Sequence, residues 1–159
     1  MKSFSDYPDQ VEAKKNDDLV LLPAWNEGQW ALLADYTEMV GFETGDVVIR
    51  AGDTDRSIFI IVEGELEILI PQGSGGQLKR TETAEAGGVI GEQAFIDGKP
   101  RSATVRALTS CKLLHLRLKS FNELAAHHPD LARDILFGLA HVLSIKLRHA
   151  NLYISKWIK

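Results

Sequence analysis

The sequence predicts an α+β fold, in which an eight-stranded antiparallel jelly-roll β-barrel is flanked by an N-terminal helix and C-terminal helices. Three observations lead to this prediction. Helical spacing of apolar residues appears near the N-terminus, short apolar runs cut by glycine and proline fill the middle, and helical spacing returns after residue 119. With 159 residues, of which 45% are hydrophobic, the chain is long enough to bury a substantial core.

The first 18 residues are polar and charged, and neither a helical nor a strand period runs through them. This predicts a flexible leader at residues 1–18, followed by a single domain at residues 19–159. The leader lacks the apolar run of a signal peptide, and no segment is apolar over the length of a membrane span. Cys111 is the one cysteine and cannot form an internal disulfide, so a cytoplasmic protein with a reduced, buried thiol is expected.

A short helix is expected from about Asn26 to Glu38. Asn26 and Gln29 have the spacing of a capping box, in which each side chain accepts a hydrogen bond from the other residue's backbone. Trp30 and Leu33 follow at helical intervals.

The barrel is expected over about residues 41–118, where apolar runs of strand length alternate with glycine-containing turns. Leu66, Ile68 and Ile70 stand at every second position, as in a strand with one buried face. The run from Ile58 to Val62 is apolar throughout, as in a strand that is buried on both faces. About eight strands fit into the segment, which favours a jelly roll.

Two C-terminal helices are expected over about residues 120–157. Ser120 and Glu123 have capping-box spacing, and Pro129 suits the first turn of a helix that reaches about Trp157. One apolar stripe of this last helix has coiled-coil spacing, and its members are Leu136, Ala140, Leu143, Leu147, Ala150, Ile154 and Trp157. A second stripe, expected to pack on the barrel, consists of Leu131, Ile135, Leu139, Val142 and Ile145. The coiled-coil stripe predicts either a homodimer seam or a helix folded back on its own barrel.

The formal net charge of −4 is unevenly distributed. Residues 1–111 carry 10 basic and 19 acidic side chains, whereas residues 112–159 carry 8 and 3. An acidic chain is poorly suited to binding nucleic acid through its phosphates, so no DNA binding by this chain is expected. No pair of histidines has the spacing of a common zinc site, so no metal is expected either.

The segment from Gly87 to Val105 carries the most specific chemistry. Small residues leave the backbone open around Gly91, and a short helix beginning near Glu92 would point free N–H groups at one spot. Arg101 and the hydroxyl of Ser102 arrive at the head of a strand, so amides and a guanidinium would form an anion site suited to phosphate. Because a carboxylate repels phosphate, Glu92 fits only a ligand that also offers hydroxyl donors, such as a ribose.

This segment resembles the phosphate-binding cassette of the cyclic nucleotide-binding domain family. The family pattern is Gly-Glu, then apolar or small residues and a short loop that ends in Arg-Ser/Thr/Ala-Ala-Thr-Val. This chain has Gly91-Glu92 and, later, the run Arg101-Ser102-Ala103-Thr104-Val105. The resemblance extends over about residues 21–157, and it implies a cyclic nucleotide as the ligand.

The resemblance implies that Arg101 pairs with the cyclic phosphate and that Glu92 accepts a hydrogen bond from the ribose 2′-hydroxyl. Further phosphate contacts would come from Gly91, Ala94, Ser102 and Ala103, and the walls of the base site from Leu78, Val89 and Ile90. Gln93 stands where the family usually has Leu, Ile or Met, and there it could add a polar contact to the ligand site or loosen the packing behind the cassette. In the family the helix after the barrel covers the base, which here assigns that position to Lys146, Leu147, Arg148 or Tyr153.

The same residues allow other interpretations. Glu92 and Arg101 could form a salt bridge that only ties the cassette to a strand, as in a nucleotide-free interaction or dimerisation module. A transcription regulator would need two more helices after Trp157, so the chain would be only the sensor part of one. An enzyme on a similar barrel would need metal ligands or a nucleophile with its base, and the sequence presents neither pattern.

We therefore expect a non-enzymatic regulatory module that senses a cyclic nucleotide, with cyclic AMP favoured over cyclic GMP. A ligand that binds Arg101 and touches the last helix would shift the position of that helix, since a ligand moves a conformational equilibrium only by its differential affinity. The helix would then expose or hide a surface for an effector protein or for a second copy of the chain.

Overall fold

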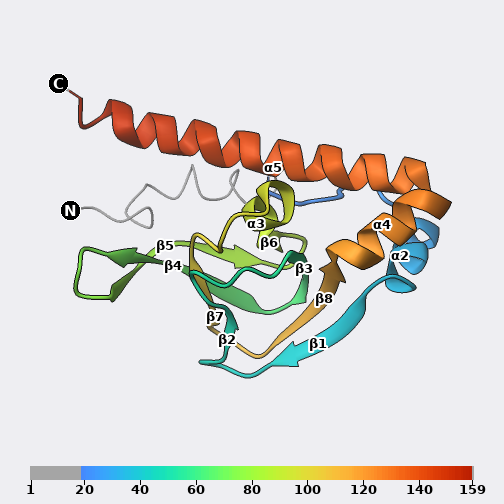
Figure 1. Ribbon diagram of the computed structural model, residues 1–159, viewed down its shortest axis with the longest axis horizontal. Coiled ribbons are helices and arrows are strands. Elements are labelled where there is room, and N and C mark those ends of the chain that lie inside the picture. Colours follow the sequence, from blue (N-terminus) through green and yellow to red (C-terminus); the bar gives the residue numbers. More distant parts are fainter. Residues whose placement is uncertain (1–18, 159) are drawn as a thin grey trace.

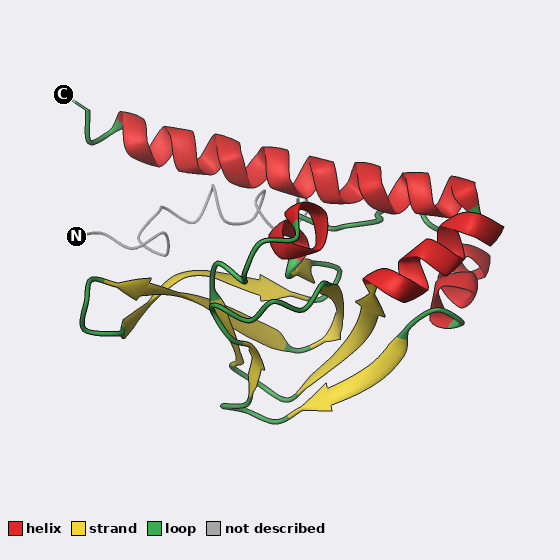
Figure 2. Cartoon of the chain, in the orientation of Figure 1, coloured by secondary structure: helices red, strands yellow, loops and turns green. Residues whose placement is uncertain are grey.

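The computed structural model describes residues 19–158, so the expected leader at residues 1–18 lies outside the described residues. The fold is α+β, with two antiparallel four-stranded sheets and helices at both ends (Figures 1 and 2). The helices are α2 (Glu27–Ala34), α3 (Glu92–Asp97), α4 (Leu118–His127) and α5 (Pro129–Ser155). The strands are β1 (Glu38–Phe42), β2 (Val47–Ile49), β3 (Ser57–Glu63), β4 (Glu65–Gln72), β5 (Gln77–Glu85), β6 (Val89–Ile90), β7 (Thr104–Ala107) and β8 (Cys111–Arg117).

The strands are hydrogen-bonded into two sheets of order β1-β8-β3-β6 and β2-β7-β4-β5. Their number and the antiparallel pairing confirm the expectation of eight antiparallel strands. The ladders run within each sheet, so closure into a jelly-roll barrel stays a prediction.

Strand β3 divides the core into two clusters. Ile58 and Ile60 pack in the cluster beneath the helices, whereas Phe59 and Ile61 pack in the cluster between the two sheets. Burial of β3 on both faces is therefore confirmed for this stretch, while Val62, at its end, is 39% exposed. Cys111 is buried in the cluster between the sheets, as expected.

Helix α2 has the predicted capping box but ends earlier than expected. Asn26 Oδ1 accepts from the Gln29 backbone, and Gln29 Oε1 accepts from the Asn26 backbone, each at 3.0 Å. The helix stops at Ala34, and the hydroxyl of Thr37 donates to the Leu33 carbonyl oxygen at 3.1 Å. The chain then enters β1 at Glu38, because pairing of β1 with β8 outweighs the helical pattern.

The two C-terminal helices differ from prediction at the start of α4 and by two residues at the end of α5, which stops at Ser155. The expected capping box at Ser120 is wrong, because β8 runs directly into α4 and Arg117 takes the N-cap position without a side-chain cap. The backbone N–H of Leu118 instead donates to the Arg56 carbonyl oxygen at 3.0 Å. Pro129 lies in the first turn of α5, which has 27 residues.

Helix α5 runs the length of the molecule along one side and passes over α3 (Figure 1). Ile135, Leu139 and Val142 of the expected packing stripe are buried, which confirms that this face contacts the rest of the fold. The coiled-coil stripe faces outward, with Leu147 61% and Trp157 62% exposed.

Candidate functional site

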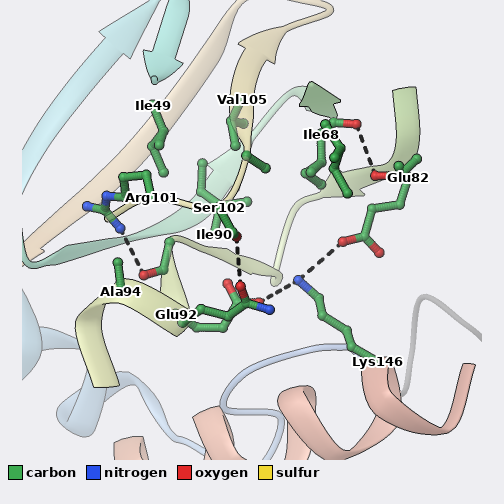
Figure 3. A pocket seen from close by; sticks show the side chains of 15 residues that line it. Ile49, Ile68, Glu82, Ile90, Glu92, Ala94, Arg101, Ser102, Val105 and Lys146 are labelled. Carbon is green, nitrogen blue, oxygen red and sulfur yellow. Dashed lines mark hydrogen bonds and ion pairs between the residues drawn. The ribbon is translucent and has the colours of Figure 1, made fainter. Parts of the chain in front are cut away.

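A cavity of about 130 Å³ lies between the sheet β2-β7-β4-β5, helix α3 and helix α5 (Figure 3). Strands of that sheet and β6 contribute an apolar wall of Ile49, Ile68, Ile70, Ile90 and Val105. The other side is formed by polar residues, which are Thr81, Glu82, Glu92, Gln93, Arg101, Ser102 and Lys146, and by the small residues Gly91, Ala94 and Ala103. The cavity therefore combines a broad apolar wall with a few convergent polar groups, which is the usual composition of a small-molecule site.

Gly91 allows the backbone to pass close to Arg101 at the start of α3. Its φ of 84° lies in the left-handed region. A Cβ at this position would come within 2.5 Å of Arg101 Nη1 and 3.0 Å of the Ser57 carbonyl oxygen. Only glycine fits both the conformation and the space, so this residue fixes where the guanidinium lies relative to α3.

Arg101 is 4% exposed and is held by four hydrogen bonds. Its Nε and Nη2 donate to the two carboxylate oxygens of Asp55 at 3.2 and 2.6 Å. Nη2 also donates to Ser57 Oγ at 3.0 Å, and Nη1 donates to the Gly91 carbonyl oxygen at 2.9 Å. The hydrogen bond from Arg101 holds the pKa of Asp55 below its ordinary value, although partial burial opposes this.

Glu92 is 5% exposed and accepts a hydrogen bond from a lysine of α5. Lys146 Nζ lies 2.7 Å from Glu92 Oε1 and 3.4 Å from Glu82 Oε1, so one ammonium bridges α3 and β5 (Figure 3). Burial opposes the charged form of Lys146, but the two carboxylates outweigh it and raise the pKa of Lys146 above its ordinary value. Arg101 and Glu92 thus pair with other residues, and the salt bridge between them that the sequence allowed does not form in the structure.

The cavity brings together most of the residues expected at the site. Those in its lining are Ile90, Gly91, Glu92, Gln93, Ala94, Arg101, Ser102 and Ala103. Ser102 Oγ donates to Gln93 Oε1 at 2.7 Å, so Gln93 makes a polar contact within the cassette.

Of the four candidates to cover the base, Lys146 lies in the cavity lining, whereas Leu147, Arg148 and Tyr153 do not. Val89 and Leu78 also lie outside the lining. Val89 neighbours Ile90 on β6 and therefore points to the opposite side, into the core beneath the helices. Leu78 lies near the turn of the β4–β5 hairpin, where it is 46% exposed. Arg148 follows Lys146 by two residues on α5 and is exposed, since two residues turn a helix by about 200°. Their contacts with a ligand stay predictions.

Sequence reasoning missed the partners of the two buried charges. Asp55 and Ser57 hold Arg101 from 46 and 44 residues away, and Glu82 on β5 shares Lys146 with Glu92. The position of Asp55 two residues before the buried strand β3 was a signal that it lies near a strand end. No pattern in the sequence pointed to the pairing itself, because it depends on the packing of distant segments.

Two absences concern only the part of the chain that the structure describes. Within residues 19–158, no group of three or more histidine, cysteine, aspartate or glutamate side chains is arranged to hold a metal ion. No helix in the same range is long and apolar enough to cross a membrane.

Arg101 and Glu92 are both buried and line one cavity, and Gly91 precedes Glu92 and packs closely against the Arg101 guanidinium. This site defines the chain as a small-molecule-binding protein. The sequence model of the cyclic nucleotide-binding domain matches residues 39–128, more than half of the chain. The chain therefore belongs to the cyclic nucleotide-binding domain family, as the cassette residues indicated.

Known proteins show how far this likeness extends. The chain is similar to a cAMP-dependent protein kinase regulatory subunit from Blastocladiella emersonii, with 35% identity over 99 residues, which are 62% of this chain and 24% of that protein. It is also similar to the Pycsar effector protein BcPycTIR of Burkholderia cepacia, with 27% identity over 147 residues, 92% of this chain and 44% of that protein. The chain thus spans less than half the length of either relative.

A solved structure has the same fold. A cyclic nucleotide-binding domain from Methylobacillus flagellatus KT superposes with a TM-score of 0.77 and 21% identity, covering 93% of this chain and 85% of that chain. Because identity is low, this likeness concerns the arrangement of the strands and helices.

Proposed function

We propose that the chain is a regulatory module that senses a cyclic nucleotide, with cyclic AMP as its ligand. The observation that carries this proposal is that one cavity contains two buried side chains of opposite charge. Arg101 suits a phosphate, and Glu92 suits hydroxyl groups. A cyclic nucleotide offers both within one small molecule. The similarity to the Blastocladiella emersonii relative, a cAMP-dependent protein kinase regulatory subunit, supports adenine as the base.

Both charged residues have capacity left for a ligand. A guanidinium has five N–H groups. Four of the N–H groups of Arg101 donate to residues of the described part of the chain, and the second N–H of Nη1 remains for a phosphate oxygen. Lys146 occupies Oε1 of Glu92, and Oε2 can accept from a ribose hydroxyl. Ile49, Ile68 and Val105 offer the base an apolar wall in addition to the contacts predicted for Leu78 and Val89.

Direct binding tests the proposal. Isothermal titration with cyclic AMP, cyclic GMP, cyclic CMP, cyclic UMP and 5′-AMP would give the order of affinities, and we expect cyclic AMP to bind most tightly. Arg101→Ala removes a charge-assisted contact with the phosphate and should weaken binding by about a hundredfold, equivalent to about 2.7 kcal/mol. Arg117→Ala is the matched control, because it removes an arginine whose side chain is 61% exposed and pairs with the exposed Glu38. The sensor proposal fails if no cyclic nucleotide binds to folded protein, or if Arg101→Ala binds as the wild type does.

We further propose that ligand binding shifts α5 and so reaches a partner. The outward stripe of α5 has the spacing of a coiled coil, and a second copy of this chain is the partner that such a self-complementary seam fits best. Leu147 is 61% exposed and Leu143, on the same stripe, is half-buried. Sedimentation equilibrium should show a dimer that Leu147→Asp disrupts, whereas the same mass for both proteins would contradict the seam.

The module is proposed to bind rather than to catalyse, and to act through an effector that contacts α5. The two sheets are proposed to be the halves of a jelly-roll barrel, as the fold likeness to a known cyclic nucleotide-binding domain supports.

A further inference from the structure

A β-bulge in strand β5 turns Glu82 into the cavity. Along the ladder with β4, Glu82 lies opposite Ile68 and Arg80 lies opposite Leu69, so Thr81 is the extra residue of the bulge. Successive side chains of a regular strand point to opposite faces, but Thr81 and Glu82 both line the cavity. Bulges re-aim side chains in this way and are over-represented next to active sites.

The exposure of the β5 side chains follows this change of face. Lys79 and Thr81 before the shift are partly buried, and so are Glu82 and Ala84 after it, whereas the residues between them in each half are exposed. Without the extra residue, Glu82 would lie on the outer face of the sheet. The bulge therefore adds a carboxylate to a wall of the cavity.

Glu82 has hydrogen-bonding capacity that the protein does not use. Within residues 19–158, the polar partner of its side chain is Lys146, whose Nζ lies 3.4 Å from Glu82 Oε1 and only 2.7 Å from Glu92 Oε1. A carboxylate accepts at about four lone-pair positions, so most of this capacity is left for a ligand. The hydroxyl of the neighbouring Thr81 is already used, because it donates to the Ile68 carbonyl oxygen at 3.3 Å.

Glu82 lies at the end of the cavity away from Arg101. Figure 3 shows Arg101 on the left, Glu82 on the right and the contact between Glu92 and Lys146 between them. The proposed function assigns the phosphate to Arg101 and the ribose hydroxyl to Glu92. In a cyclic nucleotide the base is attached to the ribose carbon next to the 2′-hydroxyl, on the side away from the phosphate. The base would therefore lie toward Glu82.

We propose that Glu82 reads the base of the ligand by accepting a hydrogen bond from its exocyclic amino group. An ionised carboxylate only accepts hydrogen bonds, so a keto oxygen or a ring nitrogen without hydrogen finds no donor on it. In adenine, the 6-amino group is the only N–H donor. This inference rests on the proposed function and names the contact by which the base is selected.

Two nucleotides and two proteins isolate this contact. The cyclic monophosphate of purine riboside differs from cyclic AMP only in lacking the 6-amino group. In isothermal titration, wild type should bind cyclic AMP about thirtyfold more tightly than this analogue, because a hydrogen bond to a charged acceptor is lost. Glu82→Met keeps the length of the side chain without the carboxylate, and the preference should fall below about threefold. A thirtyfold preference that persists in Glu82→Met, or one that is absent from wild type, would overturn the inference.

The ratio of the two affinities separates reading of the base from a structural role. Loss of Glu82 also removes a partner of Lys146 and a negative charge, and both changes act on the two nucleotides alike. A structural role alone would therefore change both affinities and leave their ratio at the wild-type value. Glu63→Met is the matched control, because it removes a carboxylate that is 60% exposed and pairs with Lys112 outside the cavity.

Glu82→Gln is a second variant of nearly the same shape as wild type. Cyclic inosine monophosphate has a keto oxygen in place of the 6-amino group, and wild type should bind it about thirtyfold more weakly than cyclic AMP. The glutamine amide can donate from Nε2 to this oxygen, so the difference should shrink to about fivefold in Glu82→Gln. An undiminished difference would contradict the reading of the amino group by Glu82.

The outcomes also distinguish this inference from the proposed function. If no cyclic nucleotide binds to folded wild type, the proposed function fails and the inference fails with it. If cyclic AMP binds but its preference over the purine riboside analogue survives in Glu82→Met, the sensor stands and the inference is overturned. Cyclic inosine monophosphate is also cyclic GMP without its 2-amino group. If cyclic GMP binds most tightly and loses its preference over this analogue in Glu82→Met, the assignment of adenine fails and the role of Glu82 stands.

Discussion

Arg101 is a buried cation whose counter-ion is largely exposed. The arginine side chain is 2% exposed and that of Asp55 58%, with 2.6 Å between Nη2 and Oδ2. We expect Asp55→Asn to lower the free energy of unfolding at neutral pH by about 1–2 kcal/mol, a modest value because solvent screens the exposed partner. Chemical denaturation of both proteins would measure the difference.

The pH dependence of this effect has a definite sign. The pKa of Asp55 is lower in the folded protein, so its contribution is complete above the unfolded value of about 3.9 and is lost as pH falls through the folded value. The stability gap between wild type and Asp55→Asn should therefore narrow below about pH 4. Asp53→Asn, at an exposed position two residues away, is the control. A gap that stays constant down to pH 2 would contradict a charged Asp55 as the partner.

His115 should make the fold less stable in mild acid. Its ring stacks on Phe59, with 4.3 Å between the centroids, and burial, aided by the charge of Arg117, lowers the pKa of His115. The unfolded chain then binds a proton more readily than the folded one, so stability falls as pH drops below about 6.5. Thermal unfolding between pH 7 and 5 should show this fall in wild type and a smaller one in His115→Gln. His141→Gln, at an exposed site on α5, is the control and should lose as much stability between pH 7 and 5 as wild type does.

Residue types in the cassette could be predicted from the sequence, but their partners could not. Gly91, Glu92 and Arg101 stand in a local pattern that predicts a binding site for a small anionic ligand, and in the structure all three line one cavity. Asp55 and Glu82 join them only because distant strands meet, and a sequence spacing carries no information on that meeting. The pairing of Lys146 with Glu92, 54 positions away, is of the same kind.

Gly138 sets how closely helix α5 approaches the segment before α2. A Cβ at this position would clash with the Leu21 carbonyl oxygen and lie 3.1 Å from Leu21 Cδ1. We expect Gly138→Ala to lower the free energy of unfolding by about 1–3 kcal/mol despite the better helix propensity of alanine, because the helix must move away from backbone that cannot yield easily.

Gly75→Ala in the β4–β5 turn, where a Cβ would meet nothing within 4 Å, is the control. Equal melting temperatures for Gly138→Ala and wild type would contradict the close approach.

At the scale of the element, sequence patterns identified the helices better than their ends. The capping box of α2 is local, and both of its hydrogen bonds form. β1 takes Glu38, which the helical pattern had claimed for α2, through its pairing with β8. α4 begins at Leu118, two residues before the expected cap at Ser120, because β8 runs directly into it. Pairing between strands far apart in the sequence therefore decided where α2 gives way to β1.

The whole molecule should unfold in one step. Sheet β1-β8-β3-β6 belongs to both core clusters, because successive residues of β3 face alternate clusters. Ile60→Ala removes contacts beneath the helices and Ile61→Ala removes contacts between the sheets, and each should cost about 2–5 kcal/mol in the same transition. Trp25 and Trp30 pack against the core cluster beneath the helices, so their fluorescence reports the unfolding of that cluster. Far-ultraviolet circular dichroism reports the loss of helices and strands throughout the fold. Separate midpoints for the two signals would contradict the shared sheet.

The fold class could be predicted at this scale because the change of period along the chain is strong, from helical to strand and back. Ile58 to Ile61 are apolar on both faces, which indicated a sheet between two layers. How far α5 covers the cavity could not be predicted, because this depends on where α5 lies across the cassette.

The burial of Cys111 makes the chain ready for site-directed labelling. Its side chain is 3% exposed, so a thiol-reactive probe added to the folded protein should leave it unmodified. A cysteine introduced at Leu152, which is 60% exposed on α5, would then carry the label alone. A second introduced cysteine at Leu78, 46% exposed on the β4–β5 hairpin, would allow a distance between two probes to be followed as nucleotide is added, without first removing the native thiol.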